Sequence, residues 1–199
     1  MPTLEHSIAL LALWAAFGYL LGSIPFGMVL ARVMGLGNLR EIGSGNIGAT
    51  NVLRTGNKTA AALTLLLDGG KGLVAVLLAR AFGGEDTAQV AALAAMLGHC
   101  YPVWLGFRGG KGVATFLGIL LALSFPVGLA ACAAWLVGAL ATRISSMGAL
   151  VAAATSTIAM VCLGYGIGLF LGIALTVLIF WRHRANIARI KAGTEELIP

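Results

Sequence analysis

The chain has 199 residues, of which 59% are hydrophobic and only 10% charged, and this composition excludes an ordinary soluble domain. Its net charge of +6 would suit nucleic-acid binding, but the sequence contains no nucleic-acid-binding motif, and the charge bias that orients membrane proteins accounts for the excess. At about 20 residues a crossing, seven helices take roughly 140 residues. We therefore expect one integral membrane domain, residues 1–199, built as an all-α polytopic bundle of seven transmembrane helices.

The first apolar run predicts a membrane helix over residues 8–31. It lacks a basic leading region, so we interpret it as a retained helix rather than a cleaved signal. A second crossing is expected over residues 60–79, and it carries Asp68 and Lys71 inside the apolar stretch. These two charges, three residues apart, either neutralise each other across one helical turn or act directly in function.

Apolar runs and short polar loops then alternate to the end of the chain. We expect an outer loop at residues 80–87, a third crossing at 88–99, a sixth at 148–163 and a seventh ending near Trp181. Residues 113–142 suffice for one crossing or for two short ones divided at residues 124–126. Two crossings place the terminal basic cluster beside the other basic loops, so the positive-inside rule favours them. This cluster consists of Arg182, Arg184, Arg189 and Lys191. The N-terminus then lies outside, the C-terminus lies in the cytoplasm, and 11 of the 13 lysines and arginines lie at the inner face.

A polar, glycine-rich loop at residues 44–54 has no acidic residue and ends on a cation. Backbone N–H groups near Gly48 can point at one oxyanion, and Arg54 can add a bidentate charge. Neutral donors complete this predicted anion site, and they are Ser44, Asn46, Thr50 and Asn51. The alternative interpretation is a glycine-rich turn that caps the next helix.

Two further segments at the predicted inner face have a similar character. Residues 106–115 form a second basic glycine loop that opens into a helix, without the spacing of a Walker A motif. In the last segment, His183 and Asn186 share one face of a helical tail, where His183 suits a general base, a phosphate donor or an interfacial cap. The histidines, cysteines and carboxylates lack metal-ligand spacing, so we expect no metal and no cofactor.

The three segments together resemble the bacterial membrane glycerol-3-phosphate acyltransferases that use acyl phosphate as donor, the PlsY family. The resemblance covers essentially the whole chain and rests on three motifs, at residues 43–54, 98–115 and 182–195. It implies a seven-helix enzyme of the bacterial inner membrane whose active-site loops lie at the cytoplasmic face. It also implies transfer of a fatty acyl group from acyl phosphate to the sn-1 hydroxyl of glycerol 3-phosphate, which gives lysophosphatidic acid and phosphate and begins phospholipid synthesis.

Position by position, the resemblance implies a catalytic set and a substrate-binding set. The catalytic residues are Ser44, Arg54, Lys111, His183 and Asn186. The phosphate- or substrate-binding residues are Asn46, Gly48, Thr50, Asn51, Arg108, Gly109, Gly110, Gly112, Ser146 and Glu195. Ser145 competes with Ser146 for the position of the family serine, and Glu195 pairs with Arg189 or Arg184 in an alternative structural role.

The residue types suit this chemistry because both substrates carry phosphates that would repel each other without cations and N–H donors. An acyl phosphate is already activated, so no covalent acyl-enzyme is required. The partners expected are acyl phosphate, glycerol 3-phosphate, the lipid bilayer and a soluble acyl-phosphate synthase on the basic face. The alternative function is that of a small multi-pass transporter of a phosphorylated solute, which would use similar anion loops.

Overall fold

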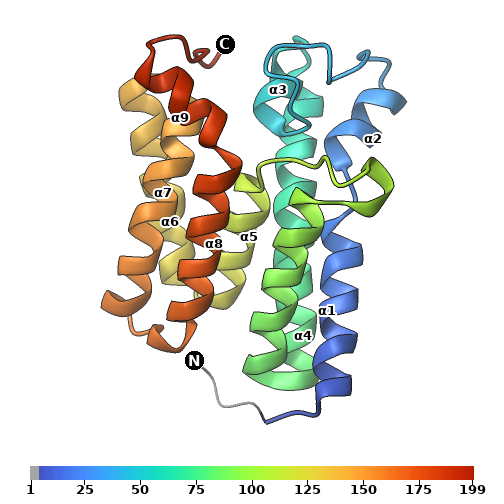
Figure 1. Cartoon of the computed structure of the whole chain (residues 1–199), viewed down its shortest axis with the longest axis vertical. Coiled ribbons are helices and arrows are strands. Elements are labelled where there is room, and N and C mark those ends of the chain that lie inside the picture. Colours follow the sequence, from blue (N-terminus) through green and yellow to red (C-terminus); the bar gives the residue numbers. More distant parts are fainter. Residues whose placement is uncertain (1–4) are drawn as a thin grey trace.

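The computed structural model describes residues 5–199, and every regular element in that range is helical (Figure 1). The elements are α1 Ile8–Gly22, α2 Phe26–Val33, α3 Ala49–Leu53, α4 Lys58–Cys100, η1 Val103–Leu105, α5 Val113–Leu123, α6 Phe125–Thr142, α7 Ser145–Cys162, η2 Gly166–Gly168, α8 Leu169–Arg182 and α9 Arg184–Lys191. Among the described residues, four helical segments are long and apolar enough to cross a membrane, or five if the bent pair α8–α9 forms one span. The chain is therefore a multi-pass membrane protein.

The expected first crossing over residues 8–31 corresponds to one candidate membrane span, Ile8–Val33, but its helix is interrupted, because α1 and α2 are separate helices. The break falls at residues 23–25, where Pro25 has no N–H and disfavours helical backbone at the residue before it. Side chains from elsewhere bond the carbonyls of this break: Trp104 Nε1 donates to Ser23 O at 2.8 Å, and Lys71 Nζ donates to Ile24 O at 2.7 Å.

The expected loop at residues 80–87 is helical except at one residue, although the chain does reverse direction there. These residues continue α4, and only Gly84 departs from helical geometry, with φ 75° and ψ −162°, a conformation that glycine tolerates and other residues avoid. The chain folds back at this single glycine, so that α4 runs along the bundle and returns as two antiparallel arms (Figure 1). Arg80 and Glu85 form an ion pair of 2.9 Å beside the turn.

The division of residues 113–142 into two helices is confirmed. α5 ends at Leu123, Ser124 is extended, and α6 begins at Phe125 with a proline in its first turn, where proline is well tolerated. α5 has only 11 residues. It packs so closely on the first arm of α4 that a Cβ on Gly118 would lie 2.0 Å from Gly69 O.

Small residues allow the helices to approach closely, as in many membrane bundles. Gly18 and Gly22 of α1 are buried against the second arm of α4, where added Cβ atoms would lie 2.5 and 2.1 Å from the carbonyls of Ala91 and Ala95. The core between the helices includes Met96 and several other fully buried apolar side chains. Many large apolar side chains remain exposed on the periphery, which suits contact with lipid.

All three motif segments lie toward the end of the bundle that carries α9 and the C-terminus (Figure 1). Direct contacts join them there. Arg40 Nη2 donates to Arg108 O, and Arg182 Nε donates to Gly110 O at 3.1 Å. Arg54 also pairs with Glu196 in the C-terminal tail. The fold therefore gathers segments that lie far apart in the sequence around one site.

Candidate active site

A cavity of about 630 Å³ opens among these segments. Most of the predicted site residues line it: Ser44, Asn46, Gly48, Thr50, Asn51, Arg54, Lys111, Gly112, Ser146, His183, Asn186 and Glu195. Three predicted residues do not line it: Arg108, Gly109 and Gly110. Arg108 is exposed outside the cavity, while Gly109 and Gly110 are buried behind its wall.

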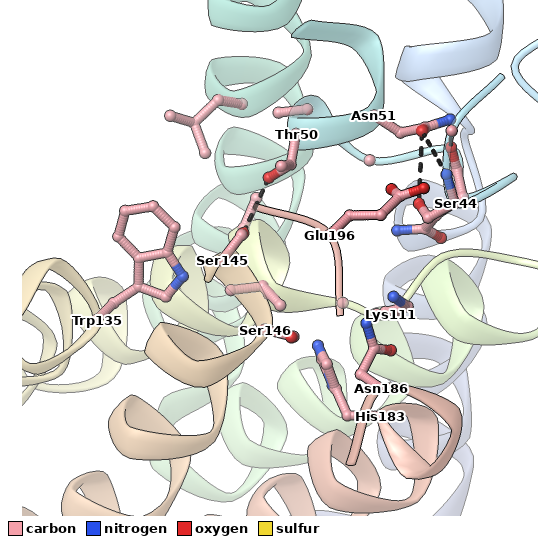
Figure 2. A pocket seen from close by; sticks show the side chains of 18 of the residues that line it. Ser44, Thr50, Asn51, Lys111, Trp135, Ser145, Ser146, His183, Asn186 and Glu196 are labelled. Carbon is pink, nitrogen blue, oxygen red and sulfur yellow. Dashed lines mark hydrogen bonds between the residues drawn. The ribbon is translucent and has the colours of Figure 1, made fainter. Parts of the chain in front are cut away.

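The first loop is folded around the side chain of Asn51, which is 1% exposed. Asn51 Oδ1 accepts the backbone N–H of Ser44 at 3.1 Å (Figure 2). Asn51 Nδ2 donates to Leu39 O and Asn46 O at 3.0 and 2.7 Å. Both amide hydrogens of Asn51 are therefore used inside the loop, and Asn51 organises the loop instead of offering its amide to a ligand.

Glycines are required in this loop for conformation and for space. Gly43 and Gly45 have φ values of 47° and 65°, in the left-handed region that favours glycine. A Cβ on Gly43 would lie 2.5 Å from Cδ of Arg54, so a larger residue would displace the arginine. Gly48, by contrast, has extended backbone and precedes the short helix α3.

The second loop presents Lys111 to the cavity (Figure 2). Its position is set from behind by Arg182 of α8, which donates from Nε to Gly110 O and from Nη2 to Gly109 O, both at 3.1 Å. The guanidinium of Arg182 also lies 4.9 Å from the centre of the Tyr101 ring. Sequence analysis had assigned Arg182 only to the terminal basic cluster.

The third segment places His183 and Asn186 on one buried face at the bend between α8 and α9, with exposures of 2% and 3%. His183 Nδ1 lies 2.8 Å from the carbonyl oxygen of Ile179. A carbonyl only accepts, so this contact places the proton on Nδ1 and leaves a lone pair on Nε2. Asn186 Oδ1 is buried and has no hydrogen-bond partner among the described residues.

Glu195 joins three of the surrounding groups. Its Oε1 accepts from Ser146 Oγ at 2.7 Å and from Asn186 Nδ2, and its Oε2 accepts from Arg189 Nε at 2.6 Å. Burial raises the pKa of Glu195, but the hydrogen bonds from Asn186, Ser146 and Arg189 outweigh burial and hold the pKa below its ordinary value. Glu195 is thus an anion in the site, and of the two expected arginine partners it takes Arg189.

The charge of Lys111 depends on its surroundings. Burial lowers its pKa to about 8; Glu195 opposes this shift, while Arg189, Arg54 and Arg182 add to it. A cavity with so many cations is suited to an anion, and binding a dianion would favour the protonated lysine.

The C-terminal tail closes part of the cavity. Arg54 Nη2 lies 3.0 Å from Glu196 Oε2, and Figure 2 shows the Glu196 side chain extending toward Ser44. Both neighbouring serines also line the cavity: Ser145 Oγ lies 3.0 Å from Thr50 Oγ1, whereas Ser146 contacts Glu195. No group of three or more potential metal ligands occurs within residues 5–199.

The apolar wall of the cavity was not predicted from the sequence, and of its two polar lining residues from α4 only Asp68 was a functional candidate. The wall consists of Leu65, Leu117, Cys132, Trp135 and Leu136, while Asp68 and His99 are polar lining residues. The wall residues come from α4, α5 and α6, and no motif marks them. Asp68 is recognisable in the sequence, because a charged residue within an apolar membrane helix is a candidate for a functional role. The cavity therefore combines a cationic, N–H-rich part with an apolar side, as an amphipathic anion requires.

Comparison with known proteins agrees with these features. Residues 12–193 match the family model described as glycerol-3-phosphate acyltransferase. The chain is 71% identical to a glycerol-3-phosphate acyltransferase of Ruegeria pomeroyi, covering 100% of this chain and 98% of that protein. It is 63% identical to one from Cereibacter sphaeroides strain ATCC 17025, covering 100% and 94%.

Two solved structures have the same fold. Both are crystal structures of PlsY, an integral membrane glycerol 3-phosphate acyltransferase. The glycerol 3-phosphate form has a TM-score of 0.90 and 40% identity, and the match covers 95% of this chain and 96% of that one. The lysophosphatidic acid form has a TM-score of 0.86 and 38% identity, with 94% of each chain covered. The chain therefore belongs to the PlsY family of glycerol-3-phosphate acyltransferases.

Proposed function

We propose that this protein transfers a fatty acyl group from acyl phosphate to the sn-1 hydroxyl of glycerol 3-phosphate, giving lysophosphatidic acid and phosphate. The observation that carries the proposal is the two-sided cavity, in which cations and glycine-loop backbone face an apolar wall. Phosphates suit the first side and an acyl chain suits the second. The two forms of the solved relative, with glycerol 3-phosphate and lysophosphatidic acid, support this assignment of substrate and product.

In this proposal Arg54 and Lys111 bind phosphate groups, aided by Ser44 and the N–H groups of the first loop. His183, Asn186 and Ser146 hold glycerol 3-phosphate. Asn186 Oδ1, which has no partner among the described residues, is available to accept a hydrogen bond from a glycerol hydroxyl. Binding both phosphates to one cluster of cations offsets their mutual repulsion and brings the hydroxyl near the acyl carbonyl.

The reaction then needs no covalent intermediate with the protein. The glycerol oxygen attacks the acyl carbonyl carbon, the bond from that carbon to the phosphate oxygen breaks, and inorganic phosphate leaves. Cations and N–H donors stabilise both the oxyanion and the leaving phosphate. Two groups are available to take the hydroxyl proton, Nε2 of His183 and an oxygen of a substrate phosphate.

The proposed topology has seven crossings and lies in the bacterial inner membrane. They are residues 8–33, 58–83, 85–105, 113–123, 125–142, 145–162 and 166–182, which are the helical segments in the structure with α4 divided at Gly84. The N-terminus lies outside, and the motif end of the bundle lies in the cytoplasm. Arginines and lysines gathered at that end support this orientation.

Turnover by the purified protein in lipid nanodiscs tests the function. The protein is supplied with glycerol 3-phosphate and either palmitoyl phosphate or palmitoyl-CoA, and lysophosphatidic acid is measured by mass spectrometry. Product should form from palmitoyl phosphate alone. It should be lost in Lys111→Ala and kept in Lys191→Ala, because Lys191 is exposed outside the cavity. A wild-type protein that forms no product from either donor would refute the proposal and favour phosphate-solute transport, tested by flux into vesicles.

A further inference from the structure

Three ionisable side chains of α4 are buried together at the cavity. Asp68, Lys71 and His99 have exposures of 2%, 3% and 5%. Lys71 Nζ donates to Asp68 Oδ1 at 2.8 Å, and His99 Nδ1 lies 3.8 Å from the same oxygen. His99 and Lys71 come from opposite arms of the α4 hairpin, so the cluster joins the two arms.

Mutual neutralisation of Asp68 and Lys71 does not explain the position of His99. An i, i+3 pair is complete with two members. His99 Nδ1 nevertheless lies buried at this pair without a hydrogen-bond partner among the described residues. Asp68 and His99 also line the cavity. A carboxylate at the cavity repels a bound anion, so a purely structural role does not account for the position of Asp68.

Contacts from the cluster lead directly to the second glycine loop. The carbonyl of His99 accepts the N–H of Gly110 at 3.1 Å. Its ring lies against the same glycine, because a Cβ on Gly110 would be 2.2 Å from His99 Nε2. The loop is therefore fitted against both the backbone and the ring of His99.

The helix that follows the loop is bonded to the backbone of α4 at Asp68. Thr115 Oγ1, in the first turn of α5, donates to the backbone carbonyl of Asp68 at 2.8 Å. Lys71 in turn donates to Ile24 O at the break between α1 and α2. The backbone carbonyls of His99 and Asp68 thus bond both ends of the loop around Lys111 to α4. The side-chain contacts among Asp68, Lys71 and His99 lie at the same two turns of α4.

We propose that Asp68, Lys71 and His99 are positioning residues that hold the loop 109–112, so that Lys111 and the loop N–H groups face the bound phosphate. They act through the loop and touch no reacting atom. The inference rests on the proposed function only in requiring that this loop binds the phosphate of glycerol 3-phosphate.

The test compares a neutral pair with a matched control. Asp68→Asn combined with Lys71→Met removes both charges at nearly constant volume and leaves no unpaired charge behind. Thr64→Val is the control, because Thr64 is fully buried one turn earlier on the same arm and its hydroxyl bonds to Ala60 O of its own helix. For each protein the Kd for glycerol 3-phosphate is measured by calorimetry, together with the Tm, KM and kcat.

The proposal expects the neutral pair to keep a Tm close to that of Thr64→Val but to bind glycerol 3-phosphate about tenfold more weakly or worse, because small displacements of binding groups are costly. An unchanged Kd and KM in a folded double variant would show that the charges only neutralise each other. Loss of folding in the double variant, but not in the control, would also overturn the proposal in favour of a purely structural pair.

A second variant tests the histidine separately. His99→Phe keeps a ring beside Gly110 and leaves the Asp68–Lys71 pair intact. A raised Kd for glycerol 3-phosphate at unchanged Tm supports the positioning role. A Kd equal to that of the wild type refutes this role for His99. The binding measurement does not depend on the acyl donor. If the wild type binds glycerol 3-phosphate but transfers no acyl group, the proposed function fails, and the Kd values of the variants still test the positioning role.

Discussion

Lys111 gives the sharpest prediction, because its charge should change within an accessible pH range. Burial lowers its pKa to about 8, as described above. The phosphate of the proposed acceptor, a monoester, has a second pKa near 6, and the proposed acyl phosphate is a stronger acid, so both are mainly dianions above pH 7. Raising the pH therefore removes the proton from Lys111 without changing the ligands, and phosphate binding should weaken as the pH rises.

The size of the effect follows from the titration. With a pKa of about 8, the protonated fraction of Lys111 falls from about 0.9 at pH 7 to about 0.1 at pH 9, so kcat/KM, which reports ionisation in the free enzyme, should fall about tenfold. Initial rates of lysophosphatidic acid formation would be measured from pH 6.5 to 9.5 at constant ionic strength, after subtraction of uncatalysed acyl phosphate hydrolysis.

The matched control is Lys111→Arg. An arginine stays protonated throughout this range, so its profile should lack the fall near pH 8 even if its activity is lower. The reasoning would be refuted if wild-type kcat/KM stayed constant to pH 9.5, or if the arginine variant showed the same inflection.

Three further variants probe the surroundings of this lysine. Glu195→Gln should lower kcat/KM about tenfold or more, because a hydrogen bond to a charged acceptor contributes about 1.5–3 kcal/mol. Steady-state rates and the Tm check this prediction. Unchanged rates would exclude a role for the carboxylate. Gly110→Ala places a Cβ 2.2 Å from a ring nitrogen and should raise KM for glycerol 3-phosphate, whereas Gly70→Ala meets no atom within 4 Å and should not. Glu196→Gln frees Arg54 from a half-exposed partner and should lower that KM about two- to fivefold, consistent with the small energy of exposed ion pairs; an increase in KM would contradict this expectation.

Much of the arrangement follows from patterns in the sequence. Glycines beside cations mark the two loops, and the charge bias favours two helices over residues 113–142, as the structure has them. The two apolar runs place the reversal within residues 80–87, but composition does not reveal that a single glycine, Gly84, makes it while the other residues stay helical. Pro25 is visible in the sequence, yet its effect depends on partners such as Lys71 for the freed carbonyls.

The contacts inside the site join residues that only the folded structure brings together. Asn51 looks like any other donor of its loop until its amide is seen to bond Leu39 and Asn46. Trp135 lines the cavity from an apolar helix that has no motif. His99 and Asp68 are 31 positions apart and meet only because α4 folds back on itself. The roles of the motif residues in catalysis stay predictions that the experiments above address.

The brevity of α5 has a consequence for where the reaction takes place relative to the membrane. Its 11 residues extend about 16 Å at 1.5 Å per residue, roughly half the thickness of a hydrocarbon core. In the proposed topology, the loop at its start is therefore recessed below the tops of the neighbouring helices, as its position in Figure 1 also indicates. A lipid-borne donor would not have to rise out of its leaflet to deliver its head group. The water-soluble acceptor would instead have to pass the level of the lipid headgroups to reach the donor.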